Sequence, residues 1–131
     1  MTYPADRKYT KTHEYVKVEG DVAYLGITTF AQDQLGDIVF VEAPEVGREI
    51  KAGEVFATVE SVKAVSDCYS PVSGKVVKVN DQTADTPEIL NEDPHGEGWI
   101  CAVEISSTSE LDELMDSADY EKHAAEGGGH D

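Results

Sequence analysis

Short apolar runs alternate with turn residues between positions 12 and 80 and predict a chain built mainly from β-strands. The first two runs predict a hairpin, because EYVKVE and VAYLGI flank a Gly20-Asp21 turn. Further strand-like runs are DIVFVE, REI, EVFATVES, AVSDCYS, KVVKVN and WICAVEI. We therefore expect a small β-sandwich or flattened barrel.

Two internal segments carry helical signals. In TTFAQDQLG we expect Thr29 to be the N-cap, Gln32 to complete a capping box and Gly36 to end the helix. Thr86-Pro87 has the form of an N-cap followed by proline at the first helical position, which predicts a short helical turn through residue 90.

The C-terminal segment changes from strand to helical periodicity. Ser107 and Glu110 have the spacing of a capping box, and a second short helix is expected near Ser117, with Tyr120 pointing inward. The apolar positions at helical spacing are Leu111, Leu114 and Met115. We expect residues 1–126 to form one domain and the GGGHD end, residues 127–131, to be a disordered tail.

The charge balance restricts the partners. With 27 acidic and 10 basic residues, the chain has a formal net charge of −17, which repels nucleic acid and anionic membranes. The acidity indicates either docking to basic protein surfaces or high-salt adaptation. No apolar run approaches the roughly 20 residues of a membrane span, and the N-terminus lacks the apolar core of a signal peptide. We therefore expect a cytoplasmic protein.

The cysteines and histidines do not form a recognisable site. Cys68 and Cys101 lie in strand-like runs without C-x-x-C spacing, so we expect two buried thiols rather than a disulfide. The four histidines are far apart in sequence and lack the paired spacing of metal ligands. We expect no metal site.

The segment VESVKAVSD isolates one lysine, Lys63, whose nearest basic neighbours in sequence are Lys51 and Lys75. The strands on either side predict a hairpin that reverses near Val62 and Lys63. Hairpin loops of two residues usually contain Gly, Asn or Pro, and this one does not, so its residues must adopt ordinary right-handed dihedrals, as in a type I turn. Lys63 is therefore predicted at an exposed tip.

An exposed lysine of this kind has three possible interpretations. Schiff-base catalysis needs a neutral amine, but Glu60 and Asp67 favour the ammonium form and an exposed tip gives no desolvation. Covalent attachment of a carrier group needs exposure and small neighbours, both of which are expected here. A plain surface lysine fits the spacing equally well, so these last two interpretations stay open.

The residues around Lys63 also resemble a known family. ESVKA followed by SPVSG is similar to the lipoyl-attachment hairpin of glycine cleavage system H proteins. The resemblance covers nearly the whole chain. The similar segments are YTKTHEYVKVEGDVAYLGIT, AQDQLGDIVFVEAPEVG, VESVKAVSDCYSPVSGKVVKVN, LNEDPHGEGW and SELDEL.

The resemblance implies a lipoyl-type barrel-sandwich hybrid, mainly β, with a short internal helix and short C-terminal helices. It also implies lipoic acid in amide linkage to Lys63, so residues 1–126 would be a lipoyl-carrier domain. The implied function is a non-catalytic carrier, expected as a monomer. It takes the aminomethyl group of glycine from a pyridoxal-phosphate glycine decarboxylase to a tetrahydrofolate-dependent aminomethyltransferase, and then electrons to dihydrolipoamide dehydrogenase.

The resemblance assigns further site residues. Thr12, Glu14 and Asp67 match a cleft that shelters the loaded arm, and Glu60 matches a residue recognised by the lipoylating enzymes. Carboxylates and a hydroxyl would hold a cationic amine well. A simpler interpretation remains for each: Thr12 could bond only a strand end, and Glu14 and Asp67 could be solvated charges.

The resemblance also separates this chain from related carriers. Biotinyl lysines are typically flanked by methionines, whereas Val62 and Ala64 occupy those places here. Lipoyl domains of 2-oxoacid dehydrogenases usually have aspartate before the lysine and lie in longer chains. The alternative function is still a lipoyl or biotinyl carrier of another multienzyme system, but these differences weigh against it. One departure is Tyr15, which stands where the family usually has tryptophan and is expected to alter packing only.

Overall fold

The computed structural model describes residues 3–126, and the predicted disordered tail at 127–131 lies outside this range. The strands are β1 (Lys8–Tyr9), β2 (Glu14–Glu19), β3 (Val22–Ile27), β4 (Ile38–Glu42), β5 (Glu49–Ile50), β6 (Val55–Ser61), β7 (Val65–Tyr69), β8 (Gly74–Val79) and β9 (Cys101–Ile105). The helices are α1 (Thr29–Leu35), α2 (Asp81–Asp85), α3 (Ile89–Glu92), α4 (Ser117–Ala125) and the 3-10 helix η1 (Thr108–Glu113).

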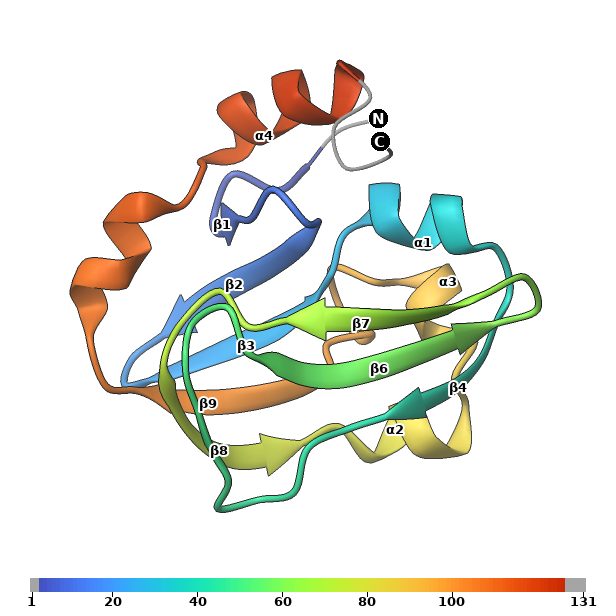
Figure 1. The fold of residues 1–131 in the computed structure, drawn as a ribbon, viewed down its shortest axis with the longest axis horizontal. Coiled ribbons are helices and arrows are strands. Elements are labelled where there is room, and N and C mark those ends of the chain that lie inside the picture. Colours follow the sequence, from blue (N-terminus) through green and yellow to red (C-terminus); the bar gives the residue numbers. More distant parts are fainter. Residues whose placement is uncertain (1–2, 127–131) are drawn as a thin grey trace.

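The strands form two antiparallel sheets (Figure 1). The first has the order β1-β2-β3-β9-β8-β5, and the second has the order β4-β6-β7. Within the described residues the architecture is mainly β with a few short helices, which confirms the predicted fold class. The predicted hairpin is β2–β3, and Gly20 adopts the positive φ of 66° that its turn requires.

Side chains from both sheets form one hydrophobic core. Leu25 of β3, Val59 of β6 and Val103 of β9 are all fully buried. Complete burial of an aliphatic side chain of this size stabilises the fold by about 1.5–3 kcal/mol. Both cysteines are buried free thiols, as predicted.

A second apolar cluster attaches the C-terminal helix α4 to the first sheet. Tyr120 of α4 is fully buried, as predicted, and its ring stacks on Tyr9 with the ring centroids 4.7 Å apart. The Tyr120 hydroxyl lies 2.7 Å from both Thr28 Oγ1 and His13 Nδ1, so its polar end is satisfied as well.

The helix starts differ from the predicted ones. The N-cap of α1 is Thr28 and not Thr29, because the Thr28 hydroxyl, at the end of β3, accepts from the Ala31 N–H at 3.2 Å. The predicted helical turn after Thr86 is present, although α3 itself begins at Ile89. Helix α2 was not predicted. Its signal is Asn80, the last residue of the strand-like run KVVKVN, whose side chain accepts from the Gln82 N–H at 3.1 Å and so caps the helix.

The predicted capping box at Ser107 and Glu110 is wrong. Ser107 makes no side-chain cap bond, and the segment is a 3-10 helix. Glu110 instead accepts from the Ser73 N–H at 2.6 Å and from the Ser73 hydroxyl at 2.7 Å. A tertiary partner thus takes the carboxylate that the local motif would have used. Among the described residues, no helix is long and apolar enough to span a membrane.

Candidate functional site

Lys63 lies at the reversal between β6 and β7, at the tip visible on the right of Figure 1. The Ser61 N–H donates to Ala64 O at 2.8 Å, and the Ser61 hydroxyl accepts from the N–H groups of Lys63 and Ala64, both at 3.1 Å. Among the described residues, His13 is the one non-glycine residue with a positive φ. No residue of the tip therefore has a positive φ, as predicted, and the type I geometry stays a prediction.

The tip is exposed, although the lysine stem and the tip backbone both approach residues 36 and 37. Val62 retains 67% exposure, and Lys63 and Ala64 are exposed as well. The lysine stem passes close to Gly36, since a Cβ added there would lie 3.2 Å from Lys63 Cε. A primary amine with small neighbours is thus accessible to a large partner.

Glu14, at the start of β2, is a buried carboxylate with only 2% exposure. Its Oε1 atom accepts from the hydroxyls of Thr10 at 2.7 Å and Thr12 at 2.5 Å. Its Oε2 atom accepts from the backbone N–H of Tyr69, the last residue of β7, at 3.2 Å. The carboxylate therefore bridges the two sheets, and the interpretation of Glu14 as a solvated charge is wrong.

Burial governs the ionisation of this carboxyl group. Desolvation raises the pKa of Glu14 to about 7, whereas the hydrogen bonds from Thr12, Thr10 and Tyr69 act in the opposite direction. Glu14 consequently exchanges its proton close to neutral pH. A cationic group placed beside it would favour the ionised form.

Asp67 lies on β7 opposite Thr58 and is exposed. No hydrogen bond or ion pair between described residues joins its side chain to Thr12 or Glu14. The structure therefore brings two of the three predicted cleft residues together, and the role of Asp67 stays a prediction.

Glu60 is exposed on β6, three residues before the lysine. In the register of the second sheet it lies between Phe40 of β4 and Val65 of β7. These two apolar neighbours are 54% and 65% exposed, so the surface next to the tip combines one carboxylate with apolar side chains.

A shallow depression of about 400 Å³ adjoins the Glu14 cluster. Its lining includes Thr10, Thr12, Tyr69 and Glu113. It lies at the end of β7 away from the tip, because Tyr69 ends the strand that Val65 begins. The first and last residues of β7 are four positions apart, which corresponds to about 13 Å of strand.

Comparison with known proteins identifies the family. Residues 7–127 match the family described as glycine cleavage H-protein. The glycine cleavage system H protein of Symbiobacterium thermophilum is 59% identical over 124 residues, which cover 95% of this chain and 97% of that protein. The Bacillus subtilis H protein is 53% identical over 126 residues, covering 96% and 99%.

A crystal structure of an H protein from Mycobacterium marinum has the same fold. It superposes with a TM-score of 0.87 at 39% identity and covers 94% of this chain and 99% of that one. The chain belongs to the glycine cleavage H-protein family. This family comprises the lipoyl carriers of the glycine cleavage system, which are carrier components rather than catalysts.

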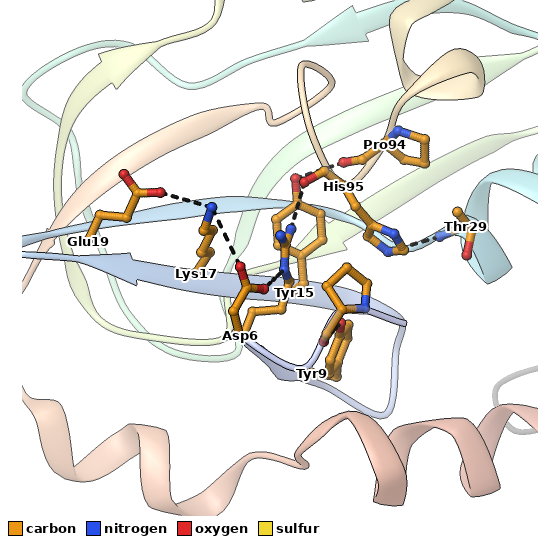
Figure 2. A network of polar contacts seen from close by, with 10 residues as sticks. Asp6, Tyr9, Tyr15, Lys17, Glu19, Thr29, Pro94 and His95 are labelled. Carbon is orange, nitrogen blue, oxygen red and sulfur yellow. Dashed lines mark hydrogen bonds and ion pairs between the residues drawn. The ribbon is translucent and has the colours of Figure 1, made fainter. Parts of the chain in front are cut away.

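In this H protein, Tyr15 does more than change the packing. Its hydroxyl donates to Pro94 O at 2.7 Å, and the Arg7 guanidinium lies 4.9 Å from the centre of its ring. Figure 2 shows the hydrogen bond between Tyr15 and Pro94 beside the ion pair formed by Asp6 and Lys17. Tyr15 thus gains a polar contact that anchors β2, the strand that presents Glu14.

The sequence did not identify Thr10 as part of this cluster. Its N–H donates to Glu14 O at 2.9 Å, and its hydroxyl accepts from the Glu14 N–H at 3.0 Å as well as donating to the carboxylate. The signal in the sequence is a threonine close to an acidic strand end, since threonine hydroxyls often close such turns. His13, with φ of 75°, completes the turn.

Proposed function

We propose that residues 1–126 act as a single lipoyl-carrier domain of the glycine cleavage system, with lipoate in amide linkage to Lys63 Nζ. The observation that carries this proposal is the exposed Lys63 at a hairpin tip, in a chain of the H-protein family. The residues present fit the group, because the amine is accessible and its neighbours Val62 and Ala64 offer little obstruction to an enclosing active site.

When bound, the lipoyl group supplies a disulfide that accepts the aminomethyl carbon of glycine and two electrons. The proposed partners are the pyridoxal-phosphate glycine decarboxylase, the tetrahydrofolate-dependent aminomethyltransferase, dihydrolipoamide dehydrogenase and the lipoylating enzymes. We place this exchange in the cytoplasm, with the chain acting as a monomer. Lys63 contributes a long stem that these enzymes can reach, because the residue is exposed and its stem lies beside Gly36, which has no side chain.

Thr12, Glu14 and Asp67 form the proposed shelter for the aminomethyl cargo. An amine that is cationic at neutral pH pairs best with an ionised carboxylate in a water-poor setting. The buried carboxyl of Glu14 offers this setting, and the hydroxyls of Thr10 and Thr12 orient its Oε1 atom. Asp67 would add a second charge from the exposed face of β7.

Glu60 is proposed as a recognition residue for the lipoylating enzymes. Its carboxylate is exposed three residues before the acceptor lysine and lies between the exposed side chains of Phe40 and Val65. A modifying enzyme that encloses Lys63 would therefore meet this carboxylate.

Intact-mass analysis tests the attachment site. Protein made in a host competent for lipoylation is expected to gain the mass of one lipoyl group, and Lys63→Arg is expected to abolish that gain completely. Arginine keeps the positive charge but offers no amine that can form this amide. Lys75→Arg, at an exposed strand position, is the matched control and should be modified normally.

The same preparation supports a functional assay. Glycine decarboxylation reconstituted with the three partner enzymes should depend on the wild-type chain and be lost with Lys63→Arg. Lipoylation that persists in the arginine variant, or an adduct with the mass of biotin on the wild type, contradicts the proposal.

A further inference from the structure

The 36–38 loop, which joins α1 to the first residue of β4, supports the lysine-bearing tip. The Val62 N–H donates to Asp37 O at 3.0 Å, which is the backbone bond that joins tip to loop. The stem of Lys63 passes over Gly36 in the same loop. The direction of the lysine therefore depends on where this loop is held.

Asn91 of helix α3 holds the loop from the other side. Its Oδ1 atom accepts from the Ile38 N–H at 2.8 Å, and its Nδ2 atom donates to Gly36 O at 2.8 Å. The amide thus binds the residues on both sides of Asp37, the residue that receives the tip. Figure 1 shows α1, α3 and the β6–β7 reversal at one end of the molecule.

We propose that Asn91 is a positioning residue for lipoylation: through the 36–38 loop it fixes the hairpin tip in the orientation that modifying enzymes recognise. This inference rests on the proposed function of Lys63. A tip that is already ordered spares the enzyme the entropy cost of ordering it on binding. Without Asn91 the Asp37 carbonyl would lose its fixed position and the tip its support.

The loop requires an asparagine for two reasons. The site needs one donor and one acceptor on a single planar group, which aspartate, leucine and alanine do not provide. Gly36 also has φ of 81° and ψ of −150°, a conformation essentially restricted to glycine, so the loop does not hold itself in a generic backbone well. The side chain from α3 therefore supplies the constraint.

Asn80 provides a matched control within the same chain. Its Nδ2 atom donates to Glu97 O and Trp99 O, both at 2.7 Å, and its Oδ1 atom caps α2. Asn80→Ala therefore removes an amide that bridges backbone groups, as Asn91→Ala does. Its partners are Glu97, Trp99 and Gln82, and no hydrogen bond between described residues joins these three to the tip or to residues 36–38.

Amide hydrogen exchange on the unmodified protein tests the coupling directly. Asn91→Ala is expected to accelerate exchange of the Val62 N–H by roughly five- to tenfold relative to wild type, the change that corresponds to loss of about one hydrogen bond. Asn80→Ala should leave Val62 exchange unchanged when the two variants are compared at equal global stability. Equal Val62 exchange in the two variants contradicts the proposal.

Lipoylation kinetics supply the functional measurement. With a purified lipoate–protein ligase, lipoate and ATP, Asn91→Ala is expected to raise the KM for the protein substrate by about three- to tenfold, with kcat nearly unchanged. Asn91→Asp keeps the acceptor for the Ile38 N–H and loses the donor to Gly36, so an intermediate KM is expected. This variant decides the question if the alanine variant does not fold. A KM equal to that of Asn80→Ala overturns the proposal.

The two proposals fail in different ways. If wild-type protein takes no lipoate on Lys63, the proposed function is wrong, but the exchange of Val62 still reports on the link between Asn91 and the tip. If the wild type is lipoylated and both measurements in the Asn91 variants match the control, only the positioning role is wrong.

Discussion

Strand β7 connects an exposed region, the Lys63 tip, with a buried one, the Glu14 cluster. Just before the first residue of β7, the chain exposes Lys63 at the hairpin tip. At the last residue of the strand, the Tyr69 N–H donates to the buried carboxylate of Glu14. The tip is held by backbone contacts to the 36–38 loop. The carboxylate is held by side-chain hydroxyls and by burial at 2% exposure.

The difference shows how one small domain can serve both delivery and protection. An amine that several enzymes must reach needs access and a defined direction, which the exposed Lys63 tip and its loop provide. A carboxylate that is to pair with a cationic cargo gains strength from desolvation, because electrostatic attraction increases as water is excluded. Three predictions sharpen this contrast, beginning with the largest effect.

Replacement of Glu14 tests the buried side. Burial raises the pKa of Glu14 from 4.5 in the unfolded chain to about 7 in the fold. The stabilising contribution of the protonated form is therefore complete below about pH 4.5 and is lost as the pH rises through about 7. Glu14→Gln removes this dependence. Urea unfolding should show wild type losing about 2–3 kcal/mol relative to the variant between about pH 5 and about pH 8.

Glu42→Gln, at an exposed position on β4, controls for the loss of one negative charge. It reports the background produced by the net charge of −17. A difference between wild type and Glu14→Gln that does not vary with pH, or that matches this control, would show that burial does not tune the carboxyl group.

Replacement of Gly36 tests the exposed side. Gly36→Ala forces alanine into a conformation that strains its backbone, so a loss of about 1–3 kcal/mol in unfolding free energy is expected. The new methyl group would also lie 3.2 Å from Lys63 Cε and displace the stem. Slower lipoylation should accompany the loss of stability, measured by mass spectrometry over time.

Gly47→Ala separates the two causes. Gly47 has φ of 98°, and a Cβ placed there would meet no atom within 4 Å. An alanine there is also strained by the positive φ, but the lysine is not involved. If Gly47→Ala slows lipoylation as much as Gly36→Ala does, the contact between Gly36 and Lys63 has no role.

The sequence predicted those features that depend on neighbouring residues. The β2–β3 hairpin follows from alternation and a glycine turn, and the exposed tip follows from strands that flank a reversal without glycine. The capping box at Ser107 and Glu110 failed because Ser73, 37 positions from Glu110, bonds to the carboxylate. A local motif does not reveal such a competitor.

The candidate site shows the same limit. The residue pattern predicts the exposed Lys63, and the family resemblance implies the roles of Thr12 and Glu14. The burial of Glu14, however, depends on β7, 55 positions away at Tyr69. No periodicity within β2 distinguishes a buried glutamate from a solvated one. The role of Asn91 was also beyond sequence reasoning, because its two backbone partners lie more than 50 positions away.

The smallest predicted effect concerns the two hydroxyls that bond to Glu14 Oε1. Hydrogen bonds to a carboxylate favour its ionised form, so Thr12→Val should raise the pKa of Glu14 further, by about half a unit to one unit. NMR titration of the Glu14 side-chain carboxyl measures this change. Because Thr12 is exposed and its hydroxyl has Thr10 as its one other hydrogen-bond partner within residues 3–126, the loss of stability should stay below about 1 kcal/mol.

Thr10→Val provides the contrast. The Thr10 hydroxyl also accepts from the Glu14 N–H, so its removal should cost more stability than Thr12→Val for a similar rise in the pKa of Glu14. An unchanged Glu14 pKa in Thr12→Val would mean that burial alone sets the ionisation of this carboxyl group. Thr12 would then have no part in preparing the site for a cationic cargo.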